Sequence, residues 1–266
     1  MHRGSFRIFR FLLPLLLATN AHAGAWTEDK GETLLILQAA GFASDDFFDK
    51  SGHLHSQPRF TKAEQQPYVE YGLKDWLTLG GTLYLQDVQQ AGVTNLGLGD
   101  PTVFARLRLW RDAKNVVSVQ PLLKLPSWYE YAGAPRGGGS STDEELALLY
   151  GRNLNIVDPR DYLDLAASYR NRSEGLHPQL RADAALGLRV SGHVLLVPAV
   201  RIVRATSIGT AFSENGDQDY DLTKVELTGE YLFDDDHWVQ ATAFDHVAGR
   251  NTGNGVGIAI AYAERF

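Results

Sequence analysis

The sequence predicts an all-β protein, namely a transmembrane antiparallel up-and-down β-barrel of about twelve strands. Three observations lead to this fold class. Almost every ordered stretch alternates apolar and polar residues with period two, which is the period of a β-strand. Short turns alternate with longer connections along the chain. The last strand is apolar on alternate residues and ends at a terminal phenylalanine, Phe266.

The alternation is clearest over residues 103–109. Val103 and Leu107 lie on one face of this stretch, and Arg106 and Arg108 lie on the other. A soluble β-sandwich would show the same pattern, because its two apolar sheet faces pack against each other. In a membrane barrel the apolar face meets lipid and the polar face lines the interior.

The spacing of the turns favours the barrel over the sandwich. Tight strand–turn–strand units are centred near Lys74, Asp112, Asp158, Ser191 and Asp235, about 40 residues apart. The connections between these units are predicted to be long and polar, and they cover 43–62, 88–100, 127–143, 171–179, 205–219 and 248–254. Short turns at one end and long loops at the other are typical of outer-membrane barrels. A first strand over 32–42 and a last strand over 255–266 bring the total to an even twelve.

The N-terminus has the features of a secretory signal peptide over residues 1–23. Arg3, Arg7 and Arg10 precede the apolar stretch 11–17, and Ala21-His22-Ala23 forms an A-x-A cleavage motif. The apolar stretch is too short to span a bilayer as a helix. Cleavage before Gly24 removes three arginines and no acid, so the net charge falls from −7 to −10. We therefore expect an exported protein whose barrel, residues 24–266, is placed in the outer membrane of a Gram-negative cell.

Aromatic residues beside the short turns predict an interfacial girdle. Such rings prefer the boundary between lipid and water, and the candidates are Trp76, Trp110, Tyr231 and Trp238. Phe266 is the candidate for the C-terminal assembly signal, although Glu264 departs from the apolar residue expected there.

The polar phase of the strands predicts a charged interior. The lumen-lining candidates are Arg106, Arg108, Lys124, Arg170, Arg181, Arg201, Lys224, Arg265, Glu70, Glu145, Asp164, Asp183, Glu226 and Glu230. A basic-leaning strip in a wet bore would attract anionic solutes. Alternatively, the charges pair across strands and fill the bore. The loop aromatics Trp128, Tyr129 and Tyr131 either form a constriction at the mouth or rest against the rim.

Composition and motifs exclude several other functions. The absence of cysteine excludes a disulfide scaffold and a thiolate site, and the acidic balance excludes a nucleic-acid partner. No G-x-S-x-G elbow occurs, and no serine pairs with a histidine by strand register, so no enzyme activity is predicted. Asp217, Asp219 and Asp221 alternate without the EF-hand spacing, and His53 with His55 supplies only two ligands. We predict no metal and no cofactor.

Three segments carry a family resemblance. Residues 69–79 (VEYGLKDWLTL), 97–102 (GLGDPT) and 248–253 (AGRNTG) resemble Gram-negative outer-membrane proteins related to the phenol-degradation meta-pathway channel-like proteins. The resemblance implies a barrel that passes small, often aromatic or hydrophobic, compounds. The partners expected are outer-membrane lipid, periplasmic chaperones, the barrel-assembly machinery and a small-molecule solute. The alternatives are a non-conducting structural or surface-binding barrel and, more remotely, a lipid-modifying barrel enzyme.

Overall fold

The computed structural model describes residues 24–126, 141–209 and 219–266. The predicted signal peptide and the aromatic candidates Trp128, Tyr129 and Tyr131 lie outside these residues. The described part of the chain contains no helix that is long and apolar enough to cross a membrane.

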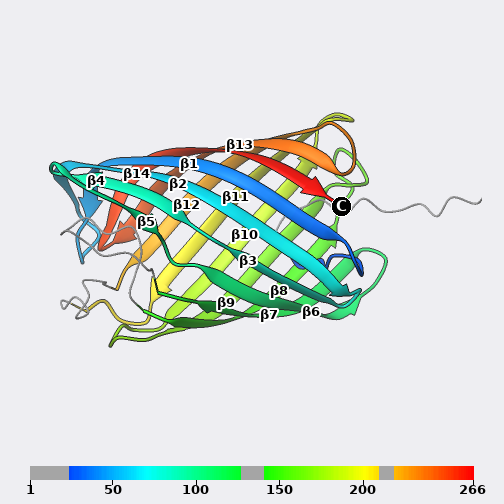
Figure 1. The fold of residues 1–266 in the computed structure, drawn as a ribbon, viewed down its shortest axis with the longest axis horizontal. Coiled ribbons are helices and arrows are strands. Elements are labelled where there is room, and N and C mark those ends of the chain that lie inside the picture. The colour runs from blue at the N-terminus through cyan, green and yellow to red at the C-terminus, as the bar shows by residue number, and fades with distance from the viewer. Residues whose placement is uncertain (1–23, 127–140, 210–218) are drawn as a thin grey trace, which may run out of the picture.

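The described residues form one antiparallel sheet that closes on itself (Figure 1). Its strand segments are β1 (Thr33–Phe48), β2 (Leu54–Lys74), β3 (Leu77–Thr82), β4 (Leu85–Gln90), β5 (Val93–Leu98), β6 (Thr102–Arg111), β7 (Asn115–Lys124), β8 (Asp143–Asn153), β9 (Tyr162–Arg172), β10 (Gln179–Arg189), β11 (Val194–Ala205), β12 (Asp221–Leu232), β13 (His237–Arg250) and β14 (Thr252–Arg265). Strand β1 pairs with β14 on one side and with β2 on the other, and this closes the barrel.

The fourteen segments make twelve wall strands, as the sequence predicts. Segments β3 and β4 both pair with β2, so together they form one interrupted strand, and β5 with β6 forms the next. Pro67 accounts for the first interruption. Its carbonyl accepts a hydrogen bond from Leu83 N at 3.1 Å, but proline has no N–H to return. The stretch from Trp76 to Gln86, which the alternation presents as one strand, is therefore broken at Leu83 and Tyr84.

The two ends of the barrel differ. At the terminal end, where β1 begins and β14 finishes, the turns cover 75–76, 112–114, 154–161, 190–193 and 233–236. These match the five predicted turn centres. At the opposite end, which we call the loop end, three predicted long connections are wrong. Strand pairing continues through 43–62, 88–100 and 248–254, and leaves short turns at 49–53, 91–92 and 251. Positive φ angles of 50° and 81° at Ala91 and Gly92 allow the tightest of these hairpins.

The outer surface of the wall is apolar, as lipid contact requires. Leu148 exposes 57% of its surface, Ile258 68% and Ile260 66%. Trp76, Trp110 and Tyr231 are also half exposed near the terminal end. Trp238 corrects the predicted girdle, because it is 3% exposed and belongs to a cluster inside the barrel. It pairs with Ala263, which is also inward, so Trp238, the second residue of β13, faces the interior.

Asp161 organises the longest turn at the terminal end, residues 154–161. Its Oδ2 accepts backbone N–H bonds from Ile156, Val157 and Asp158, at 3.1, 2.6 and 3.0 Å. Its Oδ1 accepts the N–H of Arg189 at 2.8 Å. Burial alone would raise the pKa of Asp161, but these four donors outweigh it and hold the pKa below its usual value.

Candidate transport pathway in the barrel interior

The chain's own N-terminal segment packs inside the barrel at the terminal end. Residues 24–31, which we call the plug, lie before β1, and Ala25, Thr27 and Glu28 among them are buried. The Trp26 indole contacts both apolar clusters of the interior and meets Tyr162 edge to face, with centroids 6.0 Å apart. A Cβ at Gly151 would lie 2.5 Å from the indole Cη2, so this glycine makes room for the ring.

An apolar core surrounds the plug, and strand alternation did not predict it. Many inward residues at the terminal end of the strands are large and apolar, and they lie beside a few buried charged residues. The apolar ones are Leu34, Tyr162, Leu195, Val197, Leu232 and Trp238, packed with Ile36 and Tyr68. The alternation marks these positions as one face of a strand, but it does not show that the face changes from polar to apolar along the barrel.

A buried ion pair fixes the plug to the wall. Arg106 donates from Nη1 and Nη2 to the two carboxylate oxygens of Glu70, at 2.9 and 2.8 Å, and both side chains are 1% exposed. Arg106 also donates to the carbonyl of Trp26 at 2.8 Å and to Gln120 at 3.0 Å. Both predicted lumen residues are therefore inside the barrel. Their charges neutralise each other, and Arg106 also holds the plug.

Further plug contacts come from distant parts of the chain. Thr27 Oγ1 donates to the carbonyl of Asp75 at 2.7 Å, and Thr78 Oγ1 accepts from Glu28 N at 2.8 Å. Arg265 donates to the Glu28 carboxylate at 3.0 Å. The turn between β2 and β3, strand β3 and strand β14 thus all hold the plug.

Above the plug lies a cavity of about 860 Å³. Its charged lining residues are three cations and two carboxylates, namely Lys62, Arg201, Lys224, Glu64 and Glu226. Glu226 bridges Arg201 at 2.8 Å and Lys224 at 2.5 Å. The Arg201 side chain nevertheless keeps half of its surface exposed. The predicted residues Arg201, Lys224 and Glu226 therefore meet at one place in the interior.

Aromatic rings lie beside these charges. Phe42 and Phe244 are parallel to within 1°, with centroids 6.2 Å apart, and Lys224 Nζ lies 5.1 Å from the Phe244 centroid. The rings come from β1 and β13, on either side of β14. A Cβ at Gly257 would lie 2.1 Å from Phe244 Cζ, so glycine on β14 lets the ring lie flat against the wall.

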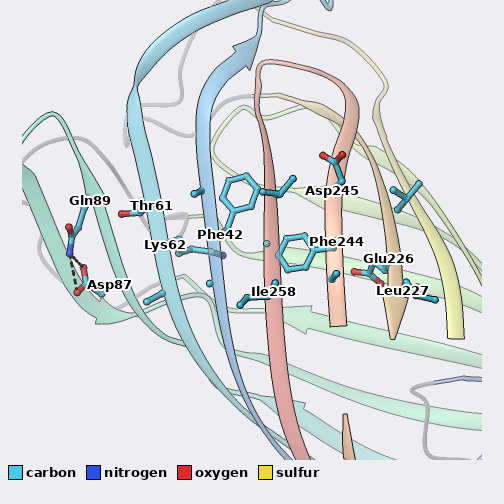
Figure 2. Close-up of a pocket in the computed structure, with 17 residues that line it drawn as sticks. Phe42, Thr61, Lys62, Asp87, Gln89, Glu226, Leu227, Phe244, Asp245 and Ile258 are labelled. Atoms are coloured by element: carbon cyan, nitrogen blue, oxygen red, sulfur yellow. Dashed lines mark hydrogen bonds between the residues drawn. The ribbon is translucent and has the colours of Figure 1, made fainter. Parts of the chain in front are cut away.

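A second hollow of about 820 Å³ involves the same stretch of wall (Figure 2). Figure 2 shows Phe42, Phe244 and Lys62 beside Ile258 and Leu227. The last two are strongly exposed on the outer surface, whereas the first three also line the interior cavity. Residues of both faces of the wall thus line this hollow, to which Gly41 and Gly257 contribute no side chain.

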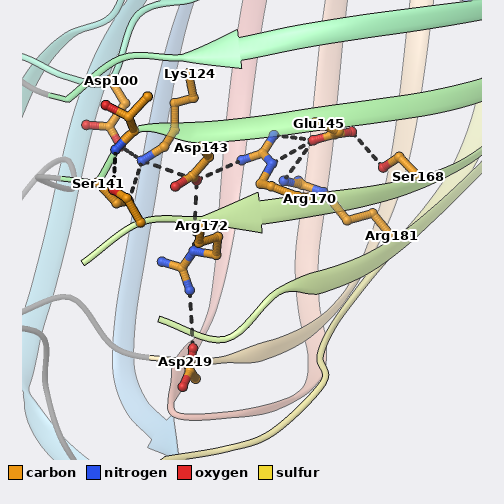
Figure 3. Close-up of polar contacts among 12 residues, drawn as sticks. Asp100, Lys124, Ser141, Asp143, Glu145, Ser168, Arg170, Arg172, Arg181 and Asp219 are labelled. Carbon is orange, nitrogen blue, oxygen red and sulfur yellow. Dashed lines mark hydrogen bonds and ion pairs between the residues drawn. The ribbon is translucent and has the colours of Figure 1, made fainter. Parts of the chain in front are cut away.

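A network of alternating charges lies at the loop end (Figure 3). Lys124 contacts Asp100 at 2.9 Å and Asp143 at 3.4 Å. The carboxylate of Asp143 also faces Arg170, which contacts Glu145 at 2.6 Å. The remaining pairs are Arg181 with Glu145 at 3.8 Å and Arg172 with Asp219 at 3.5 Å. The predicted Lys124, Arg170 and Arg181 thus neutralise acids along one side of the mouth.

The other predicted residues occupy separate places. Glu230 is buried and accepts a hydrogen bond from Gln240 at 3.0 Å. Arg108 lies at the terminal end, within electrostatic reach of Asp29 and Asp75. Asp183 faces Arg201 across 3.9 Å. Trp26 was missed, because a single tryptophan after a cleavage motif carries no periodic signal.

The acids and histidines considered as metal ligands are engaged with protein partners. Asp219 accepts from His177 Nδ1 at 2.5 Å, and Asp221 pairs with Arg250. His55 contacts Asp49 at 2.9 Å. Asp217 lies outside the described residues. Over 24–126, 141–209 and 219–266, no group of three candidate ligands could hold a metal.

Comparison with known proteins places the fold among outer-membrane barrels. No family model and no curated protein matches the sequence. An outer membrane channel from Pseudomonas putida F1 has the same fold, with a TM-score of 0.77 and 17% identity over 93% of this chain and 100% of that one. The NanC porin has a TM-score of 0.54 and 10% identity, over 86% of this chain and 98% of that one. The monoaromatic hydrocarbon channel CymD has a TM-score of 0.50 and 8% identity, over 90% of this chain and 89% of that one.

Proposed function

We propose that this protein is an outer-membrane channel for small solutes that carry an aromatic ring and a negative charge. The observation that carries the proposal is the interior cavity, in which the Phe42 and Phe244 rings lie beside Lys62, Lys224 and Arg201. An aromatic ring would stack on the phenylalanines, and a carboxylate would meet the excess of cations. The fold shared with an outer membrane channel supports this proposal, as does the resemblance to the phenol-degradation channel-like proteins.

In this proposal the terminal end faces the periplasm and the loop end faces the medium. Chain ends on the short-turn side and an apolar outer band support this placement. The signal peptide over 1–23 provides export. Trp76, Trp110 and Tyr231 form the girdle, and the strand that ends at Phe266 provides the assembly signal. Solutes enter at the loop end, and the plug closes the path at rest.

A second candidate, a non-conducting barrel, is favoured by the filled interior at the terminal end. Trp26 and the buried Arg106–Glu70 pair occupy the interior at this end. This candidate predicts that removing the plug opens nothing.

Reconstitution of the protein in planar bilayers distinguishes the channel from the non-conducting barrel. We would compare the mature protein with a variant that lacks residues 25–30, after checking by heat-modifiable mobility that both are folded. Discrete conductance steps that grow on plug removal support the channel, and so does block of the current by benzoate. Absence of steps in both proteins would assign the barrel a structural role.

A further inference from the structure

A carboxylate that no described side chain hydrogen-bonds lies inside the barrel beside the first described residue. Asp164 is on the inner face of β9, 9% exposed. No described side chain donates a hydrogen bond to its oxygens, and the described donor that acts on them is the backbone N–H of Ala25. A buried, uncompensated carboxylate is strongly unfavourable. A cation beside the carboxylate would offset this cost.

The geometry identifies where that cation would stand. A Cβ built on Gly24 would lie 2.4 and 2.5 Å from the two oxygens of Asp164, so the backbone of Gly24 packs directly against the carboxylate. Arg106 is the described cation that acts on Asp164 electrostatically. Its guanidinium is already occupied by Glu70, Gln120 and the Trp26 carbonyl.

Processing of the predicted signal peptide changes the chemistry at this position. In the precursor, the Gly24 nitrogen is a neutral amide. Hydrolysis of the Ala23–Gly24 bond adds water across it, leaving a carboxylate on Ala23 and an amine on Gly24. That amine takes a proton at neutral pH, because α-amino groups titrate near pH 8. Cleavage therefore creates a cation and three N–H donors next to Asp164.

We propose that Asp164 is the receptor site for the α-ammonium group of Gly24, and that this ion pair locks the plug once the signal peptide has been removed. Glycine is required at the new N-terminus because any side chain there would collide with the carboxylate. The inference rests on the cleavage position and is independent of whether the barrel conducts.

Chemical accessibility of the amine tests the proposal. The protein is expressed with its leader in a Gram-negative host, and the intact mass of the folded barrel is measured first, with Gly24 expected as the first residue. Brief acetylation by an N-hydroxysuccinimide ester at neutral pH then compares the wild type with Asp164→Asn and with Asp183→Asn as a matched control. Mass spectrometry of the N-terminal peptide reports labelling. Lys30, which is exposed in the same plug, is the internal standard.

We expect the α-amine to label at least tenfold more slowly than Lys30 in the wild type and in Asp183→Asn, and to lose this protection in Asp164→Asn. If Asp164→Asn does not fold, a serine inserted after Ala23 displaces the amine with Asp164 intact and should also expose it. Equal labelling of the α-amine in the wild type and the folded variants would overturn the proposal. A mature chain that begins at a residue other than Gly24 would overturn it as well.

Discussion

Arg106 and Glu70 form a bidentate ion pair inside the barrel, with N–O distances of 2.9 and 2.8 Å, and the same guanidinium holds the Trp26 carbonyl at 2.8 Å. Replacing Arg106 with leucine leaves the Glu70 carboxylate buried without its cation. We expect a loss of about 3–5 kcal/mol in the free energy of unfolding. Urea titration of the folded barrel in lipid, followed by tryptophan fluorescence, measures this loss.

The control for that experiment is Arg201→Ala. Arg201 also pairs with a glutamate, but its side chain is half exposed to the cavity. An exposed pair contributes about 0–1 kcal/mol, so this variant should unfold close to the wild type. Equal effects of the two substitutions would show that burial does not distinguish the pairs.

The Phe42–Phe244 stack gives a prediction about solute binding. Phe42→Ala removes one ring, and aromatic pairs contribute about 0.5–1.5 kcal/mol. The concentration of benzoate that half-blocks the current should therefore rise roughly two- to tenfold, whereas block by acetate should not change. Phe42→Leu, which keeps most of the apolar volume, separates stacking from simple filling of space. Loss of benzoate and acetate block together would argue against an aromatic subsite.

The cavity cations give a prediction about ion selectivity. Replacing Lys62 and Lys224 with glutamine leaves Arg201 facing Glu64 and Glu226. The cavity lining then changes from net positive to net negative, and cations should become favoured in the bore. The reversal potential across a salt gradient should move toward that of the cation, measured with the plug-deleted barrel so that current flows. An unchanged reversal potential would place the selectivity filter elsewhere.

Asp161 gives a prediction with a pH dependence. Its pKa is held low in the folded protein by four backbone N–H donors. The stabilisation is therefore fully present above the unfolded pKa of about 3.9 and is lost as the pH falls through the lower folded value. Asp161→Ala should lower the free energy of unfolding by about 1–3 kcal/mol at pH 7, and the difference from the wild type should shrink below pH 4. A gap that stays constant down to pH 2 would contradict this account.

The tryptophans give a prediction about membrane position. Trp76 and Trp110 are half exposed near the terminal end, whereas Trp238 is inside the barrel. Lipids brominated near the headgroup should quench the fluorescence of the first two but not that of Trp238, as read from single-tryptophan variants. Quenching of Trp238 to the same degree would mean that the barrel is not closed around it.

Much of the fold could be predicted because lipid imposes a local rule. Every second wall residue must be apolar, and Leu148 and Ile258 obey that rule within their own strands. The turns are local too, as the aspartates at 112 and 158 show. The loop-end hairpins were missed because polar side chains such as Asp87 and Gln89 face outward there, and pairing continues beyond the apolar band.

The interior was harder to predict because its contacts join distant residues. Arg106 and Glu70 could be assigned to the inner face from alternation, but their pairing depends on a register that crosses from β2 to β6. The Trp26 ring likewise packs against Tyr162, which lies far along the chain. Trp238 was assigned to the girdle because the sequence beside a turn does not show which face of the strand a residue occupies. A shift of one position moves a side chain from the outer face to the inner one.

The contact between Glu28 and Arg265 joins residues that are 237 positions apart. Glu28 precedes the first strand and Arg265 ends the last. The 3.0 Å contact between them therefore requires that β1 and β14 are paired. The salt bridge that holds Glu28 therefore depends on closure of the barrel, and its presence reports that the first and last strands are paired.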